Sequence, residues 1–259
     1  MSTTELTELR SAADRLIELH EAGDLDAVLD LADEVTALAG RGDVSDEVVR
    51  ESLFIARFQR AMVLTEREDL QAAAQAYAEA ASVPTDAHDP DQRHEVAMAL
   101  LHQGMCLDAL DDPQQAQTIY DQIVDRFGAA DDPVTRDQVV RARVNGAASR
   151  LAAGDAAASL EETQRLIELL DPTTPLDAEQ WVMARRIAAA ALQEQGRLQD
   201  AVTILAGVGV IDLDDPGVRE QQAQAHLDRA QVLTDLDEPG AAEDARQAAE
   251  AIAGADTLL

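Results

Sequence analysis

The sequence contains no lysine, a single cysteine and very few aromatic residues. All 20 basic residues are arginine, they face 51 acidic residues, and the formal net charge is −31. This excess of negative charge repels phosphate backbones and anionic lipid surfaces, so we expect neither nucleic acid nor a membrane among the partners. The lone Cys106 excludes an intrachain disulfide and any metal site built from several cysteines.

Signals for export and for membrane insertion are also lacking. The chain opens at Met1 without a basic segment followed by an apolar one, and no apolar run approaches the 18 residues that a membrane-spanning helix needs. We therefore predict a cytoplasmic protein.

Sequence motifs of catalysis are missing as well. There is no Gly-x-Ser-x-Gly, no P-loop, no His-Glu-x-x-His and no glycine run of a dinucleotide-binding fold. We predict no catalytic residues and no cofactor; a hydrolase is a remote alternative, because it would need a constellation that the sequence does not display. Five residues near one loop could suggest a metal, but we interpret them as turn and helix-capping residues and predict no metal site: His88, Asp89, Asp91, His94 and Glu95.

What the chain does contain is a recurring helical hairpin, clearest over residues 96–127. The apolar residues of 96–110 fall at helical spacing, and a second apolar-periodic segment follows from Ala116. Asp112 and Pro113 between them suit the N-cap and the first turn of a second helix. The small Gly104 and Ala116 would let the two helices approach closely.

The same unit recurs along nearly the whole chain. Residues equivalent to Ala116 are spaced 45, 43, 43, 42 and 41 residues apart, and we call them the repeat centres. They are Val28, Ala73, Ala116, Ser159, Ala201 and Ala242. A period in this range predicts a solenoid, which grows by addition and needs no single core. Abundant alanine can pack its helices closely although aromatics are only 2% of the chain.

The pattern resembles the tetratricopeptide repeat (TPR) family. A small residue in the first helix, a large residue three positions later, a turn, an alanine and then an aromatic match the family signature best in residues 100–127 and 61–80. The period exceeds the standard 34 residues, as in longer-helix relatives such as kinesin light chain. The resemblance implies an all-α fold, a right-handed α-solenoid of about six TPR-like hairpins, and a general role in binding.

We predict that residues 1–259 form one solenoid. Its repeats are expected at residues 4–39, 45–82, 91–127, 132–170, 177–213 and 216–254. The second helix of the fifth repeat should be short, because Gly207 and Gly209 interrupt it. The last helix is more polar than its counterparts, as a terminal repeat requires.

In TPR-like stacking the first helices line the concave surface, and the side chains that project there are expected eleven, fifteen and eighteen residues before each repeat centre. The four methionines after Met1 all fall on this predicted face. Thioether side chains adapt to varied apolar partners, so we predict a methionine-rich peptide groove. The groove residues are Ile55, Phe58, Met62, Met98, Leu101, His102, Met105, Met183 and Arg186. The alternative is that these residues fill the seam between neighbouring helices.

Arginine recurs sixteen residues before three of the repeat centres, at Arg57, Arg143 and Arg185. One interpretation is that the stems pack along the helices and the heads pair with carboxylates. The other is a cationic strip that takes a carboxylate or phosphate, with Arg141 and Asn145 close by. Asn145 alone resembles a residue of the TPR clamp that grips chaperone C-termini, so we do not assign that clamp.

The sequence thus predicts a non-catalytic scaffold that binds a protein or peptide segment. The alternative is a regulatory module that senses a small acidic ligand through groove arginines. The sequence leaves the identity of the partner and the oligomeric state open.

Overall fold

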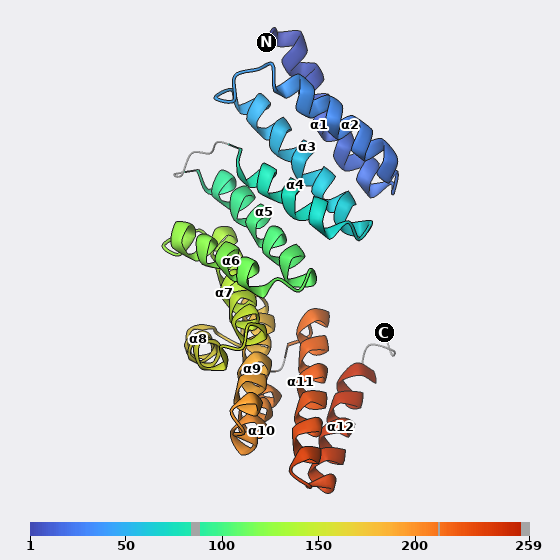
Figure 1. Cartoon of the computed structure of the whole chain (residues 1–259). Helices are drawn as coiled ribbons and strands as arrows, with labels where there is room; N and C mark the ends of the chain where they lie inside the picture. The colour runs from blue at the N-terminus through green and yellow to red at the C-terminus, as the bar shows by residue number, and fades with distance from the viewer. Residues whose placement is uncertain (84–88, 212, 255–259) are drawn as a thin grey trace. The chain divides into compact units, whose positions relative to one another are not determined.

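The computed structural model describes residues 1–83, 89–211 and 213–254, and these residues form helices joined by short turns (Figure 1). The described residues contain no strand, which confirms the predicted all-α fold. The helices are α1 (Thr3–Glu21), α2 (Leu25–Ala39), α3 (Glu47–Glu66), α4 (Leu70–Ala81), α5 (Pro90–Ala109), α6 (Pro113–Phe127), α7 (Pro133–Ala152), α8 (Ala156–Leu169), α9 (Pro175–Glu194), α10 (Leu198–Ala206), α11 (Pro216–Asp235) and α12 (Pro239–Gly254), with a 3-10 turn, η1 (Gly207–Val210). Successive helices pair into the six hairpins that the periodicity predicts.

The chain divides into two compact units. Unit 1 is Met1–Ala142 and unit 2 is Arg143–Leu259, so the boundary falls within α7. Whether the six hairpins make one continuous solenoid stays a prediction. No helix in the described part of the chain is both long enough and apolar enough to cross a membrane.

All six hairpins turn in the same way. The residue five positions before each repeat centre has positive φ, between 59° and 86°, and the six are Gly23, Glu68, Asp111, Gly154, Gly196 and Asp237. The next amide N–H donates back to a carbonyl of the last helical turn; Asp155 N, for example, donates to Arg150 O over 2.9 Å. This left-handed closure satisfies carbonyls that the helix end would leave unpaired.

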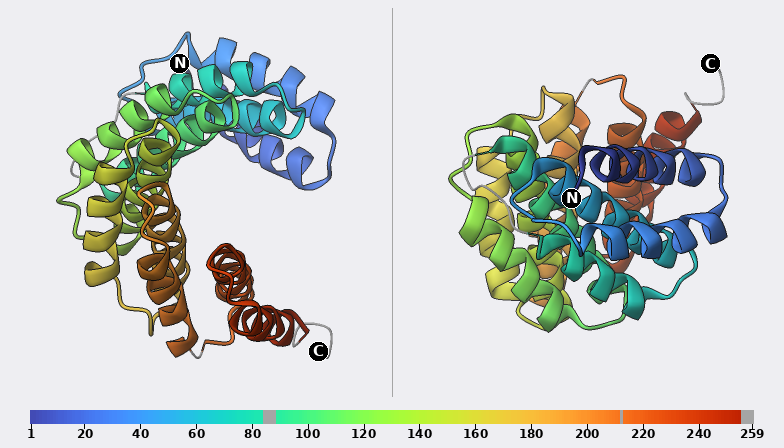
Figure 2. Two further views of the ribbon diagram at one scale, coloured as in Figure 1. Left: turned by 60° about the horizontal axis from the view of Figure 1, so that its bottom comes forward. Right: turned by 90° about the horizontal axis from the view of Figure 1, so that it is seen from above.

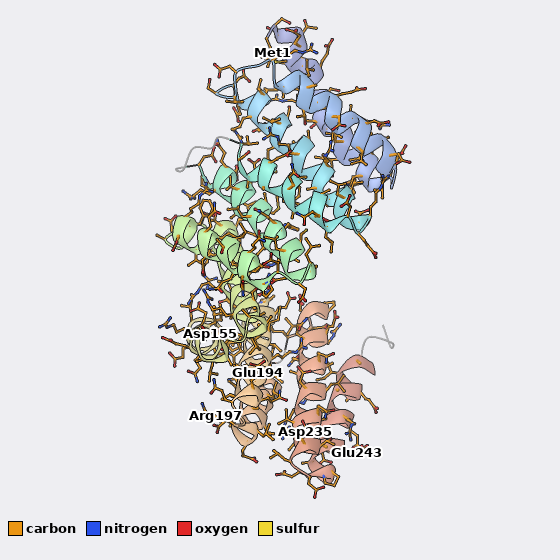
Figure 3. The ribbon with its side chains drawn as sticks, viewed as in Figure 1. Met1, Asp155, Glu194, Arg197, Asp235 and Glu243 are labelled. Carbon is orange, nitrogen blue, oxygen red and sulfur yellow. The ribbon has the colours of Figure 1, made fainter. Side chains whose placement is uncertain are left out.

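An aspartate then starts the second helix in four of the six hairpins. The side chain of Asp155 accepts a hydrogen bond from Ala158 N, and Asp24, Asp69 and Asp112 do the same three residues ahead. Arg197 stands at this position before α10 and supplies no side-chain cap. Figure 3 labels Asp155 and Arg197 at their turns. The regular spacing of these turns produces the sequence period.

In unit 1 each second helix packs against the first helix of the next hairpin, α2 on α3 and α4 on α5. Figure 2 shows these helices side by side in two further views. Their core combines alanine with a few rings: Phe58 lies 5.3 Å from Tyr77, centroid to centroid. Gly104 lies against Tyr120, because a β-carbon there would stand 2.5 Å from the tyrosine ring. That contact explains the small residue predicted at this position.

Unit 2 repeats the arrangement with α8 against α9, α9 against α10 and α11, and α11 against α12. Helix α10 has only nine residues and passes into η1, as the glycines at 207 and 209 predict. Gly207 leaves room for the guanidinium of Arg185, which a β-carbon at position 207 would displace. The first helices α9 and α11 are 20 residues each, and they carry the pocket described next.

Candidate functional site

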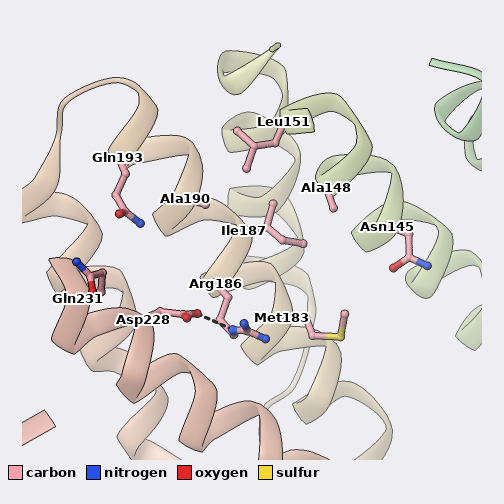
Figure 4. A pocket seen from close by; sticks show the side chains of 10 residues that line it. All are labelled: Asn145, Ala148, Leu151, Met183, Arg186, Ile187, Ala190, Gln193, Asp228 and Gln231. Atoms are coloured by element: carbon pink, nitrogen blue, oxygen red, sulfur yellow. Dashed lines mark hydrogen bonds and ion pairs between the residues drawn. The ribbon is translucent and has the colours of Figure 1, made fainter. Parts of the chain in front are cut away.

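Unit 2 contains a pocket of about 510 Å³ between three first helices (Figure 4). We call it the unit 2 groove. Helix α7 contributes one wall, α9 the floor and α11 the other wall. Its lining residues are Asn145, Ala148, Leu151, Met183, Arg186, Ile187, Ala190, Gln193, Asp228 and Gln231.

Helical spacing explains how these residues meet. On α9 the lining residues are Met183, the adjacent pair Arg186 and Ile187, Ala190 and Gln193, and steps of three or four positions between them place them on one side of the helix. Ala148 on the α7 wall and Ala190 on the floor leave space in the groove, because alanine fills less space than the leucines and isoleucines elsewhere in the chain. Leu151 and Ile187 supply the apolar surface.

One ion pair crosses the groove. Arg186 Nε lies 2.7 Å from Asp228 Oδ2, and Arg186 Nη1 donates to Gln221 Oε1 over 2.7 Å. Gln224 donates to the other oxygen of Asp228 over 3.1 Å. The pair joins α9 to α11, and it leaves the floor of the groove close to neutral although the chain as a whole is strongly acidic.

Three side-chain amides complete the polar part of the groove. Gln231 donates to Asp235 over 3.0 Å, whereas the amides of Asn145 and Gln193 make no hydrogen bond to another residue in the described part of the chain. An amide group offers two donors and an acceptor, the complement of a peptide main chain. A concave surface of apolar side chains with a few polar groups is the usual form of a binding site.

The predicted site residues in unit 2 lie as follows. Met183, Arg186 and Asn145 all line the groove. Sequence reasoning missed Leu151, Ile187, Gln193 and Gln231 as lining residues. Leu151 and Gln193 sit eight residues before the repeat centres, one helical turn closer to the hairpin turn than the predicted inner face. Gln231 and Ile187 sit eleven and fourteen residues before, on that face or next to it.

The predicted groove residues in unit 1 are less accessible. Phe58 and Leu101 are buried at 8% and 1% exposure. Ile55, Met62 and Met98 are partly buried against the same core. Met105 alone presents a large exposed surface, at 44%. Phe58 and Leu101 therefore fit the alternative that these residues fill the seam between neighbouring helices. A methionine surface on unit 1 stays a prediction that depends mainly on Met105.

His102 belongs to the ring cluster of unit 1. Its ring stacks on Tyr77 at 5.2 Å and meets Phe58 edge-on at 5.6 Å, and its Nδ1 donates to Met98 O over 2.9 Å. Burial lowers the pKa of His102, and the nearby charge of Arg141 lowers it further. A neutral, packed histidine supports the helices more than it offers a ligand contact.

The recurring arginines contact their own hairpins. Arg57 donates to Glu79 O over 2.7 Å and Arg185 to Ile204 O over 2.7 Å, in each case a carbonyl near the end of the second helix. Arg143 pairs with Glu162 at 2.6 Å. Arg185 also lies 3.9 Å above the ring of Trp181, and burial lowers the pKa of its guanidinium. The acidic-ligand alternative would require Arg57, Arg143 and Arg185 to give up these contacts. Arg141, which belongs to the same prediction, is exposed.

The loop residues that could suggest a metal form no metal site within the described part of the chain. His88 lies outside the described residues, and Asp89 caps α5 by accepting from Asp91 N and Gln92 N. Within residues 1–83, 89–211 and 213–254, no three His, Cys, Asp or Glu side chains come together to hold a metal ion. Cys106 is buried, and burial raises the pKa of its thiol, as for a packed core side chain.

Comparisons with known proteins support the fold. No family model matches the sequence, and no curated protein matches it. Among solved structures, a variant of the kinesin light chain TPR-like repeats of Podosopora anserina has a TM-score of 0.60 at 15% identity, covering 82% of this chain and 96% of its own. BtubC (BKLC) from P. vanneervenii has a TM-score of 0.61 at 16% identity, covering 90% and 92%.

A third similar structure is a tetratricopeptide repeat protein from Parabacteroides merdae, with a TM-score of 0.51 at 15% identity, covering 96% of this chain and 93% of its own. At such low identity these matches describe the fold and not the ligand. The six hairpins, their common turn and these structures agree: the chain has the fold of the TPR-like repeat proteins.

Proposed function

We propose that the protein is a non-catalytic binding module that holds a peptide segment of a partner protein in the unit 2 groove. The observation that carries the proposal is the groove itself: about 510 Å³ of space lined by apolar side chains, with the amides of Asn145 and Gln193 directed to it. A short extended peptide offers both the side chains and the main-chain groups that such a surface accepts.

The contacts of the groove divide between these two kinds of recognition. Met183, Leu151 and Ile187 would contact apolar side chains of the peptide, and the adaptable thioether suits more than one of them. The amides would hydrogen-bond its main chain. The groove lies on first helices joined by the Arg186–Asp228 pair, so its walls are ordered before the peptide arrives, which limits the entropy cost of binding.

The test begins with a peptide display library screened against the purified whole chain, followed by titration of selected peptides. Ala190→Gln should raise the Kd of a selected peptide by roughly tenfold or more, because the longer side chain fills the floor of the groove. The matched control is Ala157→Gln on the exposed surface of α8, which should leave the Kd unchanged. Melting curves of both variants check that they fold.

Two results would overturn the proposal. One is a library that yields no peptide for the folded chain. The other is a set of selected peptides whose affinity is unaffected by Ala190→Gln.

A further inference from the structure

We infer that the partner segment is apolar in its middle and basic at both ends. The inference rests on the proposed function and adds the chemistry of the ligand. It is carried by the charges along the two helices that form the floor and one wall of the groove.

The floor helix carries a carboxylate at each end of the groove. On α9 the groove is lined by Met183, Arg186, Ile187, Ala190 and Gln193, and helical spacing puts Glu179 and Glu194 on the same side of the helix just beyond them. Glu179 lies close to α11, because a β-carbon on Gly217 would stand 3.7 Å from its carboxylate.

The wall helix α11 carries a similar series. Its lining residues are Asp228 and Gln231, and helical spacing puts Gln221, Gln224 and Asp235 on the same side of the helix. Asp235 therefore lies at the same end of the groove as Glu194, near the hairpin turns, and both side chains are exposed (Figure 3). Along these two series, all within the described residues, Arg186 is the only cation, and its charge is matched by Asp228 at 2.7 Å.

A ligand in the groove thus meets a neutral middle between two acidic ends. A peptide with apolar residues at the centre would bury them against Ile187 and Met183. Basic side chains at its ends would meet Glu179 on one side and Glu194 with Asp235 on the other. Acidic ends would be repelled by the same groups and by the field of a chain whose net charge is −31.

The length of the ligand follows from the helix geometry. Glu179 and Glu194 are fifteen positions apart, which is roughly 22 Å along α9 at the α-helical rise. An extended peptide lying along the trough between α7 and α11 covers that distance with about seven residues. The two basic groups should therefore be separated by about that number of residues.

The experiment uses labelled nine-residue peptides with one apolar middle and three kinds of ends: arginine at both, glutamine at both and glutamate at both. Fluorescence anisotropy with the whole chain at about 0.05 M salt should rank the Kd values in that order, with roughly tenfold between the arginine and glutamate peptides. The preference should shrink as salt is raised.

Substitutions of the acidic residues test whether they cause the preference for arginine ends. Glu194→Gln with Asp235→Asn should weaken the arginine peptide by roughly threefold or more and leave the glutamine peptide unchanged. Both carboxylates stand at the C-terminal ends of helices, where the helix dipole disfavours anions, so their removal should not destabilise the fold. Glu168→Gln on the exposed face of α8 removes the same kind of charge elsewhere in unit 2 and is the control.

Equal affinity for all three peptides, or equal losses in the control and the double variant, would overturn the inference while the peptide groove stands. Tighter binding of the glutamate peptide would overturn it too, in favour of Arg186 taking an acidic group. Loss of all peptide binding by folded protein would instead contradict the proposed function.

Discussion

Three turn residues carry backbone strain that glycine would relieve. Glu68, Asp111 and Asp237 have φ of 59° to 60°, where the other hairpins place glycine at 72° to 86°. A residue other than glycine in this left-handed conformation destabilises the folded state by about 1–2 kcal/mol. Substitution by glycine removes that strain, but the greater conformational freedom of glycine in the unfolded chain offsets part of the gain in stability.

We predict that Glu68→Gly stabilises the protein by up to about 1 kcal/mol. Thermal and urea unfolding followed by circular dichroism measures the change. Gly154→Ala is the matched reverse substitution: no atom lies near a β-carbon there, so it should lose about the same amount through strain alone. A Glu68→Gly variant that is less stable than the parent would show that the turn angle is not strained.

Gly104 gives a second prediction at the residue scale. A β-carbon there would lie 2.5 Å from Tyr120 Cε1, so Gly104→Ala should cost about 1–3 kcal/mol of unfolding free energy. Because the clash is with the tyrosine ring, Gly104→Ala together with Tyr120→Leu should cost less than the sum of the single changes. Additive costs in this double-mutant cycle would refute the contact.

At the scale of the helix, an arginine of the first helix stabilises the end of the second. Arg57 and Arg185 stand at equivalent positions and each donates to a carbonyl in the last turn of its partner helix, α4 or α10. Each of those carbonyls also accepts a hydrogen bond from the C-cap residue, Glu79 O from Ser82 Oγ and Ile204 O from Gly207 N, and the negative end of the helix dipole favours a cation there. This role matters most for α10, which is short and lacks a side-chain N-cap.

We therefore predict that Arg185→Met destabilises the protein by about 1–2 kcal/mol, because it removes a charged hydrogen bond and the contact with Trp181. Arg15→Met is the control, since Arg15 is 59% exposed and its ion pair with Glu18 lies in solvent; it should change stability by less than about 0.5 kcal/mol. Chemical denaturation compares the two. Equal effects would mean that the carbonyl contact contributes nothing beyond a surface charge.

The sequence predicts the helices better than it predicts the site. Period, turn glycines and capping aspartates are local signals, and the hairpins follow from them. The site depends on which side of each first helix faces inward, and one residue changes that direction by about 100°. The spacing predicts Leu101 and Phe58 on the inner face, but they pack in the core, whereas Met183 and Arg186, predicted from the same pattern, line the groove.

The arginines show a second limit of sequence reasoning. The spacing groups Arg57, Arg143 and Arg185, but it does not predict where their guanidinium groups lie. A long side chain reaches across several helix positions, so its partners depend on tertiary packing. The interpretation as packed stems with paired heads fits the contacts that these residues make in the structure.

At the scale of the whole molecule, the excess of negative charge should make stability depend on salt. With a formal net charge of −31, the folded chain holds carboxylates closer together than the unfolded chain does. Screening reduces that repulsion, so Tm should rise by a few degrees between about 0.01 and 0.2 M NaCl. Scanning calorimetry measures this change, and a Tm that stays flat or falls would show that the ion pairs outweigh the repulsion.

Lowering the pH should weaken the ion pair between Asp132 and Arg93 in unit 1. Burial alone would raise the pKa of Asp132, but hydrogen bonds from Thr135 and Arg93 outweigh it and lower the pKa to about 2. The unfolded value is near 3.8, so this carboxylate stabilises the fold fully above about pH 4, and the contribution disappears as pH falls toward 2. Asp132→Asn should therefore be less stable than the parent at pH 6, and the difference should shrink between pH 4 and 2. A difference that does not change with pH would contradict this assignment.

The central claim is that unit 2 holds its partner in the groove of α7, α9 and α11, and methyl NMR of the methionines tests it most directly. The chain has five methionines, so a sample labelled only at their methyl groups gives few signals, each assigned by substitution. Met183 lines the groove and Met1 does not. On titration with a peptide that binds, the Met183 signal should move in proportion to the bound fraction while Met1 stays in place. A bound peptide that leaves the Met183 signal unmoved would contradict the account.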